Sequence, residues 1–450
     1  MVKIDVEESK VERKTSSFVF WDKTRIYIIL LTLLCVTLCQ MNSLAFNFTV
    51  ICMNDVVDNH YRHNQTEPHW LELTAEKSVL FSAAAIGGLI GLIPSVPLIS
   101  SIGLKNIQTI SGFISATGCF FFPLAVSINY YAVVICRIIQ GVGISVVFTT
   151  IGVLPGVWAP NNEASSILAI LSCSVQFSNI ICMPVSGYLC ESSLGWRYIY
   201  YIFGGFTYIF FIIFHLTYSD SPKLHKNVST KEFSKISHGK IEKPREAVPY
   251  AAVCKDPCVL SAWVSFFGGN LGYFILALYG PTYLKEILHF DVKQIGYLSA
   301  LPFVAAAVFK FTAGQISDKM LFLSEKTRFV FFAAISQVGL AAGLLVMAFT
   351  PNRVVAQGAY TFAILASALN IMGCYKCVQL RCRQHVHFTL AVASFTAYLV
   401  QLLAPLGVSI LCPDNLPEQW RLLFITVSAI VICASAPFPV FSSSQPADYC

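Results

Sequence analysis

One arginine lies inside an apolar segment that is long enough to cross a membrane. Arg137 is the only charged residue between Tyr130 and Val153, and a charge at membrane depth costs about 3 kcal/mol or more, which indicates a function. Gln140 and Gly141 follow at helical spacing, so a helix places the cation, an amide and open space on one face. A guanidinium is a planar fork of donors that suits carboxylates and phosphates. We predict that Arg137 binds the negative charge of a solute.

Other apolar segments carry isolated polar side chains that could line the same path. Asn270, Tyr273 and Tyr279 share one segment, and Gln176 and Asn179 share another. Each amide has an alternative role in a hydrogen bond between helices, and Arg137 has the alternative role of bracing helices. The predicted solute-binding residues are Arg137, Gln140, Asn270, Tyr273 and Asn179.

The composition is that of a membrane protein. Of 450 residues, 56% are hydrophobic and 12% are charged, whereas soluble domains carry about 25% charged residues. The net charge of +6 would favour nucleic acid only if the basic residues gathered on one soluble face, and here they lie between apolar runs. No P-loop pattern and no catalytic triad stands out, so we expect neither an enzyme nor ATP-driven transport.

Apolar runs of about 20 residues predict membrane-spanning helices, and open strands cannot cross lipid because their backbone groups would stay unsatisfied. We therefore predict an all-helical membrane protein with twelve spans in two halves of six. The expected spans are 26–53, 78–100, 107–127, 130–153, 164–189, 198–218, 259–283, 295–317, 328–349, 354–375, 387–411 and 420–440.

Basic residues set the expected orientation, because cytoplasmic loops carry the excess of Lys and Arg. With the N-terminus inside, 21 basic residues fall in inner segments and seven in outer segments. Both termini are then cytoplasmic, and the first apolar run is too long for a cleaved signal peptide. The expected parts are a tail (1–25), an N-terminal half (26–218), a connector rich in Pro and Lys (219–258), a C-terminal half (259–440) and a second tail (441–450).

Three further features depend on this orientation. Lys310 lies near the inner end of its span, where it either reaches out to water or is a second buried cation. Asn64, in the long outer loop, heads a glycosylation sequon that we expect to be used. Asn47 heads another sequon inside the first span, where we expect no modification.

The sixteen cysteines lie mostly in apolar stretches, where a thiol behaves as a small hydrophobe. We expect no disulfide framework, and a single bridge at Cys52 or Cys412 is left open. A cluster beside basic residues contains Cys374, Cys377, Cys382, His385 and His387, but its spacing fits no common zinc site. We expect basic anchoring at the membrane surface, with an acylated cysteine, and no metal.

A short motif follows the eighth span. Gly314-x-x-x-Asp318-Lys319 resembles the inner-loop signature of the major facilitator superfamily, which implies that these residues gate the inner side. The equivalent point of the first half retains only Gly103 and Lys105.

Further stretches resemble one branch of that superfamily, the anion–cation symporters of solute carrier family seventeen, which include sialic acid, vesicular glutamate and sodium-phosphate transporters. Three positions depart from the branch. Ile144 stands where the proton-coupling glutamate is expected, and Ser43 and Gly269 stand where arginines are expected. The matching stretches include Arg137-Ile-Ile-Gln140-Gly141, Trp158-Ala159-Pro160, Gly195-Trp196-Arg197, Pro281-Thr282-Tyr283-Leu284 and the run from Gly296 to Pro302.

The resemblance implies a monomeric alternating-access transporter of small organic anions or phosphate, with the site between its halves. With Arg137 as the one family-like cation inside a span, a monovalent anion is favoured over a dianion. No cofactor is expected. The coupling ion, H+ or Na+, and uncoupled facilitation stay open, as do the plasma membrane and endolysosomal or vesicular membranes. Two alternatives remain: a non-transporting sensor or scaffold with the same fold, and a carrier of neutral or cationic solutes.

Overall fold

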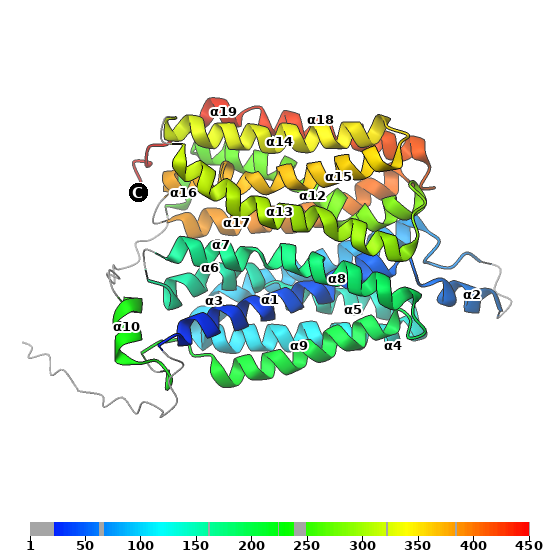
Figure 1. Ribbon diagram of the computed structural model, residues 1–450, viewed down its shortest axis with the longest axis horizontal. Coiled ribbons are helices and arrows are strands. Elements are labelled where there is room, and N and C mark those ends of the chain that lie inside the picture. Colours follow the sequence, from blue (N-terminus) through cyan, green and yellow to red (C-terminus); the bar gives the residue numbers. More distant parts are fainter. Residues whose placement is uncertain are drawn as a thin grey trace, which may run out of the picture.

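A computed structural model describes residues 22–62, 67–160, 163–223, 225–237, 249–320, 323–382 and 385–449, and within them every regular element is helical. Figure 1 shows two bundles of long helices lying side by side. The first contains α1 (Thr24–Thr49), α3 (Thr74–Phe120), α4 (Phe122–Ile128), α5 (Tyr130–Ile144), α6 (Val147–Trp158), α7 (Ala164–Ser172), α8 (Ser174–Glu191) and α9 (Arg197–Thr217).

The second bundle begins after a connector that carries two short helices, α10 (Thr230–Ser237) and α11 (Tyr250–Val253). Its long helices are α12 (Pro257–Glu286), α13 (Val292–Lys319), α14 (Glu325–Phe349), α15 (Arg353–Ser367), α16 (Cys374–Cys382), α17 (Val386–Leu411) and α18 (Pro417–Ser435), with short η1 (Ala368–Ile371) and α19 (Phe438–Phe441).

The described helices confirm the prediction of an all-helical membrane protein. Among the described residues, eleven helices are long and apolar enough to cross a bilayer, and there are twelve if the pair Ser101–Phe120 and Phe122–Ile128, bent by 45°, is counted as one span. Several predicted boundaries were wrong. The first span ends at Thr49, and the tenth continues as α16 through 374–382, which had been assigned partly to a loop.

The second and third spans were predicted as separate helices, and they are two helices that share the label α3 and meet at a break at Gly103. Gly103 has φ +84°, a conformation that L side chains rarely adopt. Asp220, which follows α9, accepts a hydrogen bond from the backbone N–H of Lys105 at 2.8 Å. A side chain on Gly103 would also meet that carboxylate. Gly103 and Lys105, which remain of the motif in the first half, therefore form a tight break between helices. Asp220 stabilises this break.

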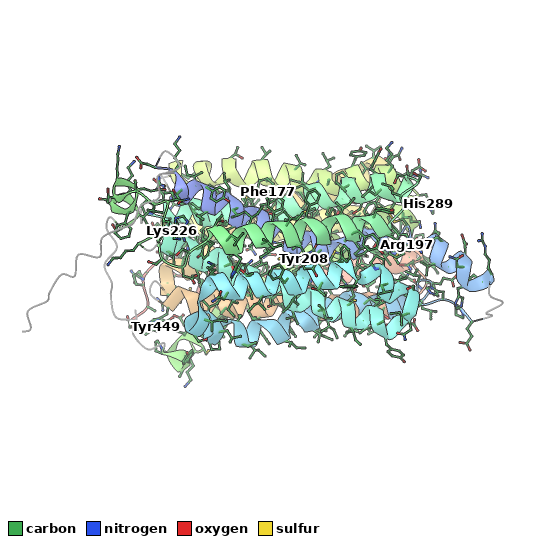
Figure 2. All side chains as sticks on the ribbon, turned by 90° about the horizontal axis from the view of Figure 1, so that it is seen from below. Phe177, Arg197, Tyr208, Lys226, His289 and Tyr449 are labelled. Atoms are coloured by element: carbon green, nitrogen blue, oxygen red, sulfur yellow. A yellow bond between two sulfur atoms is a disulfide. The ribbon has the colours of Figure 1, made fainter. Side chains whose placement is uncertain are left out.

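The two ends of the molecule differ in what they carry. The α10 end, predicted to be cytoplasmic, also holds the start of α1 and the C-terminus, and the α2 end (α2, Asn54–Arg62) lies opposite (Figure 1). Figure 2 shows Lys226 and Tyr449 at the first end and Arg197 and His289 at the second. These ends bracket an apolar belt.

A disulfide at the α2 end ties the two neighbouring helices α1 and α8 together. It joins Cys52, just after α1, to Cys190 in the last turn of α8. Cys412, the other cysteine left open by the sequence, is a buried free thiol. Disulfides form in oxidising compartments, so this bridge supports the prediction that the α2 end faces outward.

The C-terminal segment packs across the α10 end of the second bundle. Asp256 accepts a hydrogen bond from Arg381 Nε at 2.7 Å and another from the Tyr449 hydroxyl at 2.9 Å. Cys377 and Cys382 lie fully buried beneath this segment. Acylation of Cys377 or Cys382 is therefore contradicted, since both thiols are covered, whereas basic anchoring at the membrane surface stays a prediction.

The junction between the bundles is formed by α8 against α13 and by α3 against α17. At the α2 end it is closed by hydrogen bonds, among them Lys285 Nζ to the Ile51 carbonyl at 2.6 Å and Asn415 Nδ2 to Thr74 Oγ1 at 3.1 Å. Deeper in, the Tyr398 hydroxyl donates to the Ile144 carbonyl at 3.4 Å. Among the described residues, the α2 end of the junction is closed by several hydrogen bonds between the bundles.

Candidate solute-binding site

Arg137 occupies the middle of α5 and points into the first bundle. The helix starts at Asn129, whose side chain accepts the backbone N–H of Ala132 at 2.8 Å, a typical N-cap. Two turns further, Arg137 is only 1% exposed. Its guanidinium lies 4.8 Å from the centre of the Phe46 ring of α1. The predicted cation is therefore buried, among helices of its own bundle.

The donors of Arg137 are engaged by neighbouring helices. Nε donates to the Leu80 carbonyl of α3 at 3.2 Å, and Nη1 donates to the Ser43 carbonyl of α1 at 2.9 Å and to Gln140 Oε1 at 2.6 Å. Gln140 in turn donates to the Gly118 carbonyl at 3.1 Å. The predicted pair of Arg137 and Gln140 forms, and it links α1, α3 and α5 through backbone carbonyls.

The open space expected beside Gly141 is filled by α3. A Cβ on Gly141 would lie 2.9 Å from the Cα of Gly87 and would also collide with the Ala84 carbonyl. Real Cβ atoms do not approach other atoms this closely. Gly141 therefore serves helix packing, and no solute fits at that point.

The remaining predicted lining residues do not meet Arg137. Asn179 on α8 is 2% exposed; its Nδ2 donates to the Val175 carbonyl at 2.9 Å, and its Oδ1 has no partner. Asn270 and Tyr273 lie on α12 in the second bundle, and Asn270 Nδ2 is also buried without a partner. Among the described contacts, no hydrogen bond joins these three residues to Arg137.

Lys310 is the polar group whose role the sequence left undecided. It is 6% exposed, and its Nζ donates to Ser172 Oγ at 2.7 Å. Because Ser172 ends α7 and Lys310 belongs to α13, this bond crosses the junction between the bundles. Lys310 is thus a second buried cation, and the alternative in which it reaches water was wrong.

Three aromatic rings run from Arg137 to the second bundle. Phe46 packs on Phe81 at 5.2 Å between ring centroids, and Phe81 packs on Tyr279 of α12 at 4.8 Å. The Tyr279 hydroxyl is 3.2 Å from Ser78 Oγ. Tyr279, noted from the sequence as possible lining, therefore joins the two bundles.

Two predicted features lie beyond the described structure. The backbone of Gly314, Asp318 and Lys319 belongs to the last turns of α13, but the side chains of these gating candidates lie outside the described residues. Asn64, the predicted glycosylation site, also lies outside them.

Known proteins resemble this chain in sequence and in fold. Human sialin is 26% identical over 400 residues, which cover 85% of this chain and 78% of that protein. Mouse sodium-dependent phosphate transport protein 3 is 30% identical over 251 residues, 55% of this chain and 52% of that protein. A crystal structure of a D-xylose-proton symporter superposes with a TM-score of 0.72 at 17% identity, covering 93% of this chain and 98% of that one.

A second solved structure, a bacterial homolog of the human lysosomal transporter Spinster, gives a TM-score of 0.69 at 14% identity, with 93% of this chain and 97% of that chain covered. At these identities the structures show the fold alone. The sequence pattern of the Major Facilitator Superfamily matches residues 32–405, well over half of the chain. Together with the helical architecture, this match shows that the chain belongs to the major facilitator superfamily.

Proposed function

We propose that this transporter carries small organic anions or inorganic phosphate by alternating access. The observation that supports the proposal is that the buried charges inside the bundles are positive. Arg137 and Lys310 are buried in spanning helices, and their described partners are carbonyl, amide and hydroxyl oxygens. Because a low-dielectric interior with uncompensated positive charge favours anions and disfavours cations, a negatively charged solute fits best.

The acidic residues of the spanning helices support the same conclusion by their placement. All of them lie in the terminal turns of their helices, and no described ion pair joins one of them to Arg137 or Lys310. They are Glu76, Glu191, Glu286, Asp318, Glu325 and Glu418.

The relatives agree with an anionic solute, since the names of several state phosphate transport. Coupling is a separate matter. Ile144 occupies the position of the family's proton-site glutamate, and its carbonyl instead accepts from Tyr398. We therefore propose that no carboxylate at position 144 carries a coupling proton. Transport is then driven by a sodium gradient or is simple facilitation.

Uptake into proteoliposomes tests the proposal. The purified protein is reconstituted, and labelled phosphate, sialic acid and glutamate are compared with neutral glucose and cationic choline under imposed sodium and pH gradients. We expect saturable uptake of at least one anion and none of the neutral or cationic solutes. Uptake of glucose or choline alone, or no uptake of any anion by folded protein, would contradict anion transport.

A further inference from the structure

Lys310 lies on the face of α13 that is turned toward the other bundle. Gly296, Ser299, Phe303 and Lys310 recur at spacings of three, four and seven residues, which places them on one side of a helix. This face is turned toward α8, because Gly296 packs directly on Gly187 of that helix.

The opposite face of α13 is exposed on the outside of the bundle. Its large apolar residues include Tyr297, Leu301 and Val308. These positions lie on the side of the helix opposite Gly296, Ser299, Phe303 and Lys310. The Lys310 side chain therefore points away from the lipid. A lysine in this orientation does not serve to anchor the helix at the membrane surface.

The ammonium group of Lys310 is incompletely paired in a buried place. It has three N–H donors and one described acceptor, the Ser172 hydroxyl. No described ion pair includes Lys310, and a neutral hydroxyl does not compensate a buried charge. This differs from Arg137, whose Nε and Nη1 already hold three acceptors of the first bundle.

Further unsatisfied polar atoms lie on the two helices that form this junction, α8 and α13. Ser299, on the Lys310 face of α13, is 1% exposed and its hydroxyl has no partner. Asn179 of α8 is 2% exposed and its Oδ1 has no partner. Buried polar atoms normally have partners, so these two atoms show that α8 and α13 each leave hydrogen-bonding capacity unused, about 16 Å from Lys310 along the helix in the case of Ser299.

We propose that Lys310 binds the negative charge of the transported anion at the junction of α8 and α13, and that the anion displaces the Ser172 hydroxyl. This inference rests on the anion transport proposed above and assigns its charge-binding group to Lys310 instead of Arg137. One ammonium at the junction suits a solute with a single carboxylate or a singly charged phosphate. Displacement of Ser172 also breaks a hydrogen bond between the bundles, which couples binding to their separation.

The first test compares lysine variants on one helix. Lys310→Met removes the charge, Lys310→Arg keeps it, and Lys293→Met is the matched control, because Lys293 is an exposed lysine in the first turn of α13. With the anion that wild-type protein takes up, we expect Lys310→Met to raise KM at least tenfold, Lys310→Arg to recover most of the loss, and the control to match wild type. An unchanged KM in Lys310→Met would overturn the assignment.

The second test keeps Lys310 and decides the matter if Lys310→Met does not fold. Ser172→Asp places a fixed carboxylate beside the ammonium, and Ser172→Asn places a neutral group of the same size. We expect the aspartate variant to take up at least tenfold less anion than the asparagine variant, because the fixed carboxylate competes with the solute. Equal uptake by the two variants would overturn the proposal.

The two proposals fail in different ways. If the wild-type protein takes up no anion, anion transport itself is wrong. If wild-type uptake is robust and neither Lys310→Met nor Ser172→Asp reduces it, anion transport stands and Lys310 is only a contact between the bundles.

Discussion

At the level of single residues, the two buried cations differ in what surrounds them. Arg137 is held by carbonyl groups of α1 and α3 and by Gln140 within its own helix. Lys310 has one described contact, and it crosses the junction between the bundles. We therefore expect Arg137 to matter first for the stability of the first bundle and Lys310 to matter first for the solute.

The substitution Arg137→Gln tests this expectation for Arg137. It removes the hydrogen bonds from the guanidinium to the Ser43 and Leu80 carbonyls, and a hydrogen bond from a charged donor is worth about 1.5–3 kcal/mol. We expect a clear fall in Tm of the detergent-purified protein. Arg421→Gln at the exposed start of α18 serves as the control. An unchanged Tm together with a raised KM would instead assign Arg137 to the solute.

Part of this arrangement was accessible from the sequence. The pair of Arg137 and Gln140 follows from helical spacing alone, and it is present. The carbonyl partners were not predictable, because Leu80 and Ser43 lie 57 and 94 residues away along the chain and every residue has a carbonyl. The burial of Lys310 depended on the rotation of α13, which is set by its packing on α8.

At the level of helices, close backbone contact between α3 and α5 determines where Arg137 lies. Gly87 and Gly141 face each other there, and a side chain at either position would collide with the neighbouring backbone. Small residues allow such contact between membrane helices, where packing drives association. The same contact brings the Leu80 carbonyl within reach of the guanidinium.

The substitution Gly141→Ala should separate α3 from α5. Overpacking of this kind costs about 1–3 kcal/mol, so we expect a lower Tm and reduced uptake. Gly156→Ala in α6 is the matched control, because a Cβ there meets nothing within 4 Å. Equal melting temperatures for the two variants would show that the close approach is not needed.

The helices themselves were largely predictable, because length and apolarity are properties of the sequence. The break of α3 was placed near the correct residues, but its form was not foreseen. Lys105 and Asn106 were assigned to a loop, whereas the helix resumes at once after Gly103. The resumption depends on Asp220, which lies 115 residues further along the chain than Lys105 and was not identified as a partner.

At the level of the whole molecule, hydrogen bonds between described residues join the bundles at the α2 end, and the first bundle is also cross-linked there. The disulfide joins residues 138 positions apart. Arg197 at the start of α9 adds an ion pair to Asp55 at 2.6 Å, although an exposed pair contributes little. The ends of α1 and α8 therefore move as one unit when the bundles change their relative position.

The variant Cys190→Ser tests the contribution of this cross-link. Removing a disulfide typically costs about 2–4 kcal/mol, so we expect a lower Tm and a new thiol that a membrane-impermeant maleimide labels from the α2 side. Cys433→Ser, at an exposed free cysteine, should leave Tm unchanged. Labelling of Cys52 in untreated wild-type protein would show that the bridge is absent.

The proposed role of Lys310 also implies that transport responds to voltage. A unit charge that crosses the full membrane field exchanges about 2.3 kcal/mol per 100 mV. Under the proposed binding mode, a monoanion cancels the charge of Lys310, so the loaded carrier is close to electrically neutral at this point while the empty carrier is not. The membrane potential then acts mainly on the return of the empty carrier. An electrical gradient therefore changes the rate of that step.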